Sequence, residues 1–205
     1  MLKPDRKKFG ADPFGYSALA WHQWGTAQII AGFSVEPKVA PTSADLKDPI
    51  LWVTQATALS EAAKILLRTE PSWEHMPLTA RGMCDSQYCA AALMLVGYSL
   101  EVGLKGMQII KKGIEVYTNE ERSFLHHRLE DLAELVPNLD AKDKAILRLL
   151  THFTTWAGRY PDPGKKFESS ASEIFNLSEK NQLNGRDLFV LASKVMNHMQ
   201  VVVNE

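Results

Sequence analysis

Apolar residues recur at intervals of three and four along most of the 205-residue chain, which is the periodicity of α-helices with one buried face. No alternating run is long enough to predict a β-sheet. The longest periodic stretch predicts a helix over residues 82–112, with Gly113 as its stop. We therefore predict an all-α fold, a helical bundle of five to six helices in one domain over residues 1–205.

Capping residues and prolines place the first two helices. An N-terminal arm at residues 1–12 precedes an aromatic-rich helix predicted over residues 13–33. After a proline-containing loop, Asp48 has the character of an N-cap and Pro49 suits the first helical position. A second helix is therefore predicted from there to about Thr69.

The C-terminal half is predicted to contain shorter elements separated by breakers. These are a turn with a capping box at Thr118 and Glu121, helices beginning at His127 and at Asp140, and a last helix over residues 184–202. Between the last two helices, residues 161–183 are polar and contain a glycine and four serines. A connection of that length is either functional or disordered, and we interpret it as a long loop.

The composition is typical of a globular protein with a core, and the net charge does not indicate a particular ligand. Hydrophobic residues make up 45% of the chain and charged residues 23%, and the formal net charge is −1. The chain can therefore bury a substantial core. A near-neutral charge favours an ordinary solvated surface, so any binding of nucleic acid must depend on a local basic patch.

The chain shows no pattern typical of secretion or membrane insertion. Residues 1–10 are basic and polar and lack the apolar segment of a secretory signal. The longest apolar stretch, residues 89–100, is too short to span a bilayer and is followed by Glu101 and Lys105. We predict a soluble, cytoplasmic protein that does not associate with a membrane.

Two charged residues of the long helix are the first candidates for chemistry. Glu101 and Lys105 are four residues apart with the acid first, the favoured orientation for a helical ion pair. They lie beside the apolar stripe. They are interpreted either as an exposed structural pair or, if partly buried, as a pair that orients a group facing a substrate.

Further candidates come from a histidine and a basic cluster. His127 either caps or packs its own helix, or faces the long helix and contacts Glu101 or a ligand phosphate. Arg159 precedes a rigid Tyr-Pro turn and, with Lys165 and Lys166, forms a basic cluster suited to binding an anion or phosphate. Alternatively, Arg159 satisfies the last carbonyl groups of its own helix or pairs with Glu101.

Three segments, in this order, resemble the HEPN superfamily of helical proteins. They are the run from Tyr98 to Met107 with its Glu and Lys four apart, the His-x-Leu-x-x-Leu segment that begins at His127, and the Arg-Tyr-Pro turn at Arg159. The resemblance covers about residues 88–162. It implies a HEPN-like domain that binds RNA or a nucleotide and forms a homodimer. It further implies a role in a defence, toxin–antitoxin or stress system with a cognate protein partner, and ligand-binding roles for Glu101, Lys105, His127, Arg159, Lys165 and Lys166.

The signature of catalytic HEPN proteins is missing from its usual place. The resemblance implies an Arg-x(4–6)-His motif that cleaves RNA without metal, in which arginine stabilises phosphate charge and histidine moves a proton. No histidine follows Arg159 at that spacing. The pair Arg122 and His127 meets the spacing elsewhere, at a frequency that chance explains.

Three hypotheses follow. The first is a HEPN-like domain that binds RNA or a nucleotide without the usual ribonuclease activity. The second is a non-catalytic homodimeric interaction module in which the candidate residues are structural. The third is a metal-independent endoribonuclease that uses Arg122 and His127. The chain has no phosphate-binding glycine loop and no zinc-ligand spacing, so no metal or other cofactor is predicted.

Overall fold

The computed structural model describes residues 6–18, 20–36, 39–165 and 167–205. Within these residues the protein consists of helices and connecting turns, with no strand. The predicted all-α fold is therefore confirmed. Eleven α-helices are present in the described part of the chain, which is more than the five to six predicted, because several of the predicted helices are divided into shorter ones.

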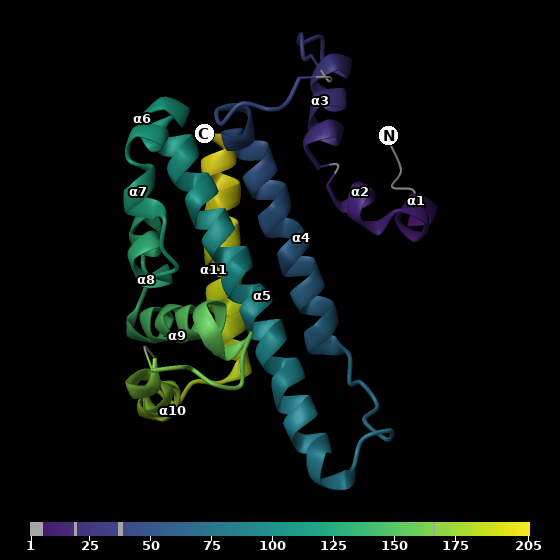
Figure 1. Ribbon diagram of the computed structural model, residues 1–205. Helices are drawn as coiled ribbons and strands as arrows, with labels where there is room; N and C mark the ends of the chain where they lie inside the picture. Colours follow the sequence, from purple (N-terminus) through teal and green to yellow (C-terminus); the bar gives the residue numbers. More distant parts are fainter. Residues whose placement is uncertain (1–5, 19, 37–38, 166) are drawn as a thin grey trace. The chain divides into compact units, whose positions relative to one another are not determined.

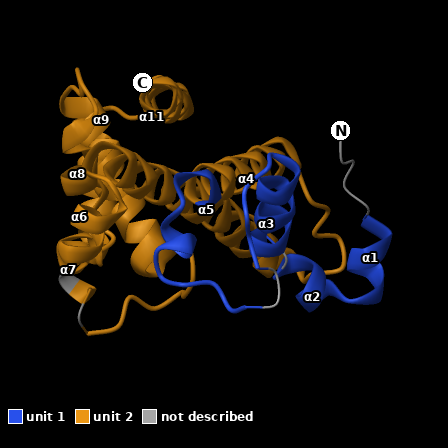
Figure 2. Ribbon diagram, turned by 90° about the horizontal axis from the view of Figure 1, so that it is seen from above, with its two compact units in different colours: residues 1–51 blue, residues 52–205 orange. Residues whose placement is uncertain are grey.

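The chain divides into two compact units, Met1–Leu51 and Trp52–Glu205, which Figure 2 distinguishes by colour. The first unit contains α1 (Arg6–Ala11), α2 (Pro13–Ser17), α3 (Ala20–Ile30) and the short 3-10 turn η1 (Asp45–Lys47). The prediction of a single domain over residues 1–205 stays a prediction, because this division describes packing and not independent folding.

The N-terminal predictions need two corrections. The predicted arm contains α1, and the helix predicted over residues 13–33 is divided into α2 and α3. Only Gly25 of α3 is buried, so the apolar residues there surround the helix and do not form one buried stripe. An apolar period without a buried face gives a poor estimate of where a helix begins and ends.

The second unit contains most of the helical structure. Its elements are α4 (Pro49–Arg68, of which the first three residues belong to the first unit), α5 (Leu78–Lys112), α6 (Ile114–Asn119), α7 (Glu121–Phe124), α8 (Leu129–Leu132), η2 (Ala133–Leu135), α9 (Ala141–His152), η3 (Phe153–Ala157), η4 (Glu168–Ser170), α10 (Ala171–Lys180) and α11 (Gly185–Asn204). Figure 1 shows α5 running between α4 and α11, with α6 to α9 along one side.

The core of this unit is organised around α5. Eleven residues of this helix are buried, and α5 packs against α11, α9, α8 and η3. The largest fully buried side chains include Leu100 and Leu104 of α5, Leu147 of α9 and Leu191 of α11. The Ser99 hydroxyl donates a hydrogen bond of 2.8 Å to the Ala56 carbonyl and so joins α5 to α4. A central helix with partners on several faces holds its side chains in fixed positions.

Several predicted helix ends are confirmed by their caps. Asp140 forms a capping box with Asp143 at the start of α9, and Asn184 does the same with Asp187 at the start of α11. Gly113 ends α5 with a φ of +81°, a conformation that glycine adopts without strain. The two capping boxes satisfy backbone N–H groups that a helix N-terminus otherwise leaves without partners, and the Gly113 N–H donates to the Ile109 carbonyl at the C-terminus of α5.

Other boundaries differ from the predictions. The long helix begins at Leu78, four residues earlier than predicted. Thr118 lies inside α6, where its hydroxyl donates to the Ile114 carbonyl, so it does not cap a helix. The turn at Gly113 lets α6 begin directly after α5. The capping pattern at Thr118 predicts a later helix start.

Residues 161–183 are the clearest correction, because they are not one long loop. They include η4 and the ten-residue α10, which packs against α9. Ile174 and Leu177, half-buried and three residues apart, supply the apolar face of α10. Two apolar residues among many polar ones are too few for a helical period to be evident in the sequence.

Two helices also have the length and apolar composition of a membrane span, namely α4 and α5. Half of the apolar window of α5 is buried inside the protein, as expected of a central core helix, whereas little of the α4 window is buried. The predicted cytoplasmic location stays a prediction.

Candidate functional site

The candidate residues of α5 meet at a buried carboxylate. Glu101 is almost fully buried near the middle of the helix. Its Oε1 accepts a hydrogen bond of 2.7 Å from Lys105 Nζ, one turn later, and its Oε2 lies 2.9 Å from His127 Nδ1. A charge removed from water requires such partners. Of the two arrangements considered for Glu101 and Lys105, the partly buried pair is the one observed.

His127 lies in the short connection between α7 and α8. It contacts Glu101 from there, one of the two positions considered from the sequence. A carboxylate beside Nδ1 favours the proton on that nitrogen, which makes Nε2 the acceptor of the neutral ring. The side chain remains 46% exposed, and no contact of Nε2 occurs among the described residues. The ring is thus oriented by a buried acid while its second nitrogen is available to a ligand.

Tyr98 connects this pair to the predicted basic residue. It precedes Glu101 by three residues, so the two side chains lie on one face of α5. Its hydroxyl donates a hydrogen bond of 3.0 Å to the Thr154 carbonyl. The His127 ring meets the Tyr98 ring edge-on, at 6.3 Å between centroids, and the guanidinium carbon of Arg159 lies 5.3 Å from the centre of the same ring.

Arg159 follows η3, a π-helical turn that directly continues α9. The side chains of Thr154 and Thr155 donate hydrogen bonds to the Thr151 carbonyl, which is typical of places where a helix departs from regular geometry. The sequence predicted one helix up to Pro161, so the π-helical turn is a correction. Such turns are frequent at functional sites.

Close packing on α5 holds this turn in place. A Cβ atom at Gly97 of α5 would lie 2.5 Å from Thr154 Cγ2, and one at Gly158 would lie 2.9 Å from the Phe153 carbonyl oxygen. Only glycine permits this approach at the two positions. The two glycines therefore allow η3 to present Arg159 above Tyr98.

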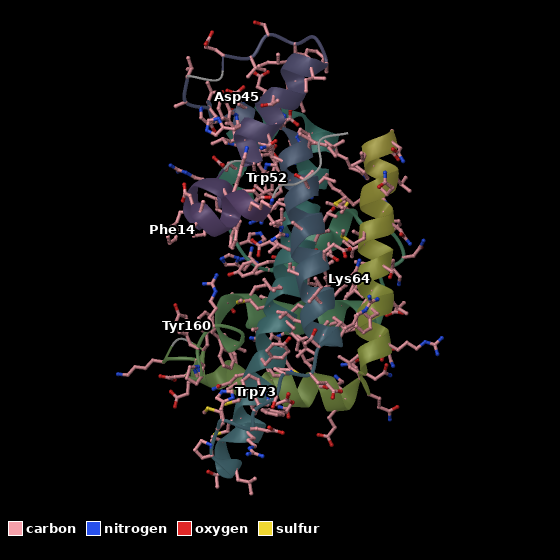
Figure 3. The ribbon with its side chains drawn as sticks, turned by 90° about the vertical axis from the view of Figure 1, so that its right-hand side faces the viewer. Phe14, Asp45, Trp52, Lys64, Trp73 and Tyr160 are labelled. Carbon is pink, nitrogen blue, oxygen red and sulfur yellow. The ribbon has the colours of Figure 1, made fainter. Side chains whose placement is uncertain are left out.

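Arg159 is exposed, and no carboxylate of the described residues contacts it. Its predicted pairing with Glu101 is absent, since Lys105 and His127 occupy that carboxylate. The backbone N–H groups of Arg159 and Tyr160, not the guanidinium, satisfy the Trp156 carbonyl. Tyr160, labelled in Figure 3, is also exposed. A guanidinium placed over a ring keeps its in-plane N–H donors for an anion.

The remaining predicted residues are not brought into this cluster by any described contact. Lys165 is exposed in the segment after η3, where Gly164 has a φ of +68° and the Asp162 side chain accepts its N–H. Lys166 lies outside the described residues. Arg122 is exposed on α7, without a described contact to His127. The predicted basic cluster and the Arg122–His127 pair therefore stay predictions.

A second histidine borders the site. Burial lowers the pKa of His126, and the positive charge of Arg128 lowers it further, against an opposing effect of Asp131. Its Nδ1 accepts a hydrogen bond of 3.2 Å from the Arg128 backbone N–H. A neutral His126 adds a polar group near Glu101 and Lys105 without adding charge.

Sequence reasoning missed Tyr98 and His126. Tyr98 is the first residue of the segment that resembles the HEPN superfamily. It precedes Glu101 by three residues and Lys105 by seven, which is the spacing of one helical face. That spacing was the available signal. Nothing in the sequence indicated that His126 would be half-buried, because the position follows from the irregular connection between α7 and α8.

No protein-family model, curated protein or solved structure matches this chain.

The described residues contain no group of three or more His, Cys, Asp or Glu side chains placed to hold a metal ion. What the cluster does offer is an oriented imidazole, an exposed guanidinium and an aromatic ring between them. These groups can bind an anionic oxygen and can donate or accept a proton at His127 Nε2. A phosphate ester can use both properties, since it has anionic oxygens and is cleaved with proton transfer.

Proposed function

We propose that this protein binds RNA or a nucleotide through the phosphate, at a site formed by Tyr98, Glu101, Lys105, His127 and Arg159. The observation that carries the proposal is the contact of His127 Nδ1 with the buried Glu101 carboxylate, beside the exposed Arg159. The guanidinium is suited to phosphate oxygens, and so is the imidazole when both of its nitrogens carry a proton, because Nε2–H can then donate to the phosphate. The proposal includes a HEPN-like domain that lacks the usual ribonuclease motif.

The role of Glu101 and Lys105 in this proposal is positioning. Lys105 is largely buried and its ammonium group is engaged by Glu101, so it neutralises the carboxylate more readily than it reaches a ligand. Glu101 in turn fixes the orientation of the imidazole. Arg159 and His127 are the groups expected to touch the phosphate.

The test is a binding measurement with a labelled single-stranded RNA, and separately with ATP and AMP, on wild type, Arg159→Ala and His127→Ala. Arg186→Ala is the matched control, because Arg186 is an exposed arginine on another helix, α11. We expect Arg159→Ala to weaken binding by about tenfold, or about 1.4 kcal/mol, with the control unchanged. Equal losses in Arg159→Ala and Arg186→Ala would indicate only diffuse electrostatic attraction and would overturn the proposal.

A second candidate, a metal-independent endoribonuclease, is favoured by one feature. A carboxylate that orients a histidine is a common arrangement for general acid–base catalysis. In this hypothesis His127 moves the proton, and Arg122 stabilises the phosphate charge. Incubation of labelled RNA in EDTA would show cleavage by wild type and none by His127→Ala or Arg122→Ala. Wild-type cleavage no higher than in both variants excludes this candidate and leaves the binding proposal intact.

A further inference from the structure

An apolar cavity lies beneath α10, apart from the phosphate site. Its volume is about 320 Å³, and it lies among side chains of α5, α9, η3, α10, α11 and the turn before α11. The apolar lining includes Leu93, Leu149, Phe153, Ile174, Leu183 and Leu188. None of the residues proposed to bind phosphate contributes to the cavity, so this inference is independent of the proposed function.

The cavity is partly open to solvent, because most of its lining side chains are half-buried and Asn184 is exposed. An apolar cavity of about 150 Å³ stays dry and takes up benzene, and the cavity here has roughly twice that volume. Ligand sites begin at about 300 Å³ and are lined mostly by apolar side chains. The cavity therefore has the dimensions of a binding site for a two-ring molecule.

The lining also determines the charge of the ligand. No charged side chain lines the cavity among the described residues, whereas Ser178 and Asn184 are the polar side chains there. Asn184 uses Oδ1 to cap α11, accepting from the N–H groups of Arg186 and Asp187. Its amide nitrogen and the Ser178 hydroxyl are thus suited to a single hydrogen-bonding group. Because the lining offers an ionised ligand no compensating charge, the cavity favours a neutral ligand over a carboxylate or a phosphate.

One side of the cavity is a short helix with few apolar anchors. Ile174 and Ser178 of α10 line the cavity, one turn apart, yet α10 has no fully buried residue. Figure 1 shows α10 beside α9. Glu173 of α10 holds it there, with Oε1 2.5 Å from an Arg148 guanidinium nitrogen and Oε2 3.0 Å from His152 Nε2. A helix held by a few polar contacts shifts more readily than the core, so this side of the cavity can adjust to a ligand.

We propose that α10 forms one side of a binding site for a small, neutral, two-ring apolar molecule that carries one hydrogen-bonding group. Leu149, Phe153 and Ile174 contact the rings, and Ser178 or Asn184 meets the polar group.

The experiment is a titration of the full-length protein with 1-naphthol, followed by NMR and calorimetry, with 1-naphthoate as the charged control. Saturable binding of 1-naphthol, at least tenfold tighter than that of 1-naphthoate, is expected. Ile174→Trp, which fills the cavity from the α10 side, should weaken 1-naphthol binding at least tenfold. Phe175→Trp places the same side chain on the exposed face of α10 and should leave binding unchanged.

A readout in the wild type keeps the test decisive if Ile174→Trp fails to fold. Intermolecular NOEs should join the naphthol rings to the methyl groups of Leu149 and Ile174. Absence of saturable binding, equal affinity for 1-naphthoate, or NOEs only to residues outside the cavity would each overturn the proposal. None of these outcomes bears on RNA binding, which Arg159→Ala tests separately.

Discussion

At the scale of single residues, the buried Glu101 carboxylate determines the geometry of the site. It accepts from Lys105 and lies against His127, and the Lys105 side chain is only 11% exposed. Most surface ion pairs contribute little, but removal of one partner from a buried pair leaves an uncompensated charge. The same i, i+4 spacing thus has different energetic consequences according to burial, which the sequence does not specify.

Glu101→Gln tests this difference. The substitution preserves volume but leaves the Lys105 ammonium group without its carboxylate, so we expect the free energy of unfolding to fall by about 3 kcal/mol. Urea denaturation measures this loss. The control is Glu61→Gln, which removes the acid of an exposed pair with Lys64 on α4 (Figure 3) and should have little effect. Equal losses in the two variants would contradict the proposed burial of the Glu101 pair.

Tyr117, on α6, gives a pH-dependent prediction. Burial raises the pKa of Tyr117 to about 12, and the carboxylates of Glu121 and Glu101 add to the shift. A tyrosine in the unfolded chain ionises near pH 10. Between pH 10 and 12 the unfolded state has thus lost a proton that folded Tyr117 retains. The stabilisation is complete below pH 10 and is lost as the pH rises towards 12.

We therefore expect Tyr117→Phe to unfold with a shallower loss of stability between pH 10 and 12 than wild type. Urea midpoints measured at intervals across that range give the comparison. Tyr160→Phe is the control, because Tyr160 is exposed, and its profile should follow that of wild type. A Tyr117→Phe profile parallel to that of wild type would show that Tyr117 titrates as in the unfolded chain.

At the scale of elements, the predictable boundaries are those with a local chemical cause. Asp140, Asn184 and Gly113 end or begin helices through contacts within a few residues, and the sequence identified all three. The helical face of Glu101 and Lys105 was predictable for the same reason. By contrast, α10 depends on packing against α9, across the segment that contains η4, and the π-helical turn η3 depends on packing against α5, which lies much earlier in the sequence. The arrangement of Arg159 over Tyr98 depends on that packing too.

Gly97→Ala tests the contact between α5 and η3. The added methyl group would lie 2.5 Å from Thr154 Cγ2 and 3.2 Å from the Leu150 carbonyl oxygen, so the turn must shift. We expect a loss of about 1–3 kcal/mol in stability, as for other overpacked cores, with weaker binding of RNA because Arg159 moves with the turn. Gly82→Ala on the same helix meets nothing within 4 Å and should stabilise α5 by up to about 1 kcal/mol. Thermal unfolding in which both variants gain stability would contradict the close packing at Gly97.

At the scale of the whole molecule, the near-neutral charge limits how a phosphate ligand can bind. A net charge of −1 supplies no long-range attraction, so affinity must come from the few cations at the site. For single-stranded nucleic acid, the logarithm of the binding constant falls with the logarithm of the salt concentration by about 0.7 for each phosphate contact. The slope of this salt dependence therefore gives the number of phosphate contacts.

We expect a slope of about −0.7 for wild type from the Arg159 contact alone, or about −1.4 if His127 also donates to a phosphate, and a slope shallower by about 0.7 for Arg159→Ala. Titrations of labelled single-stranded RNA between about 25 and 200 mM salt provide these values. Arg186→Ala should reproduce the wild-type slope, because the charge it removes lies on another helix. A wild-type slope far steeper than −2 would mean that many surface cations contact the RNA, and an unchanged slope in Arg159→Ala would remove Arg159 from the contacts. Either result would show that RNA binds elsewhere than at the Tyr98 face of α5. The expected pair of slopes would instead locate the binding surface at that face, because the total charge of the protein cannot attract RNA by itself.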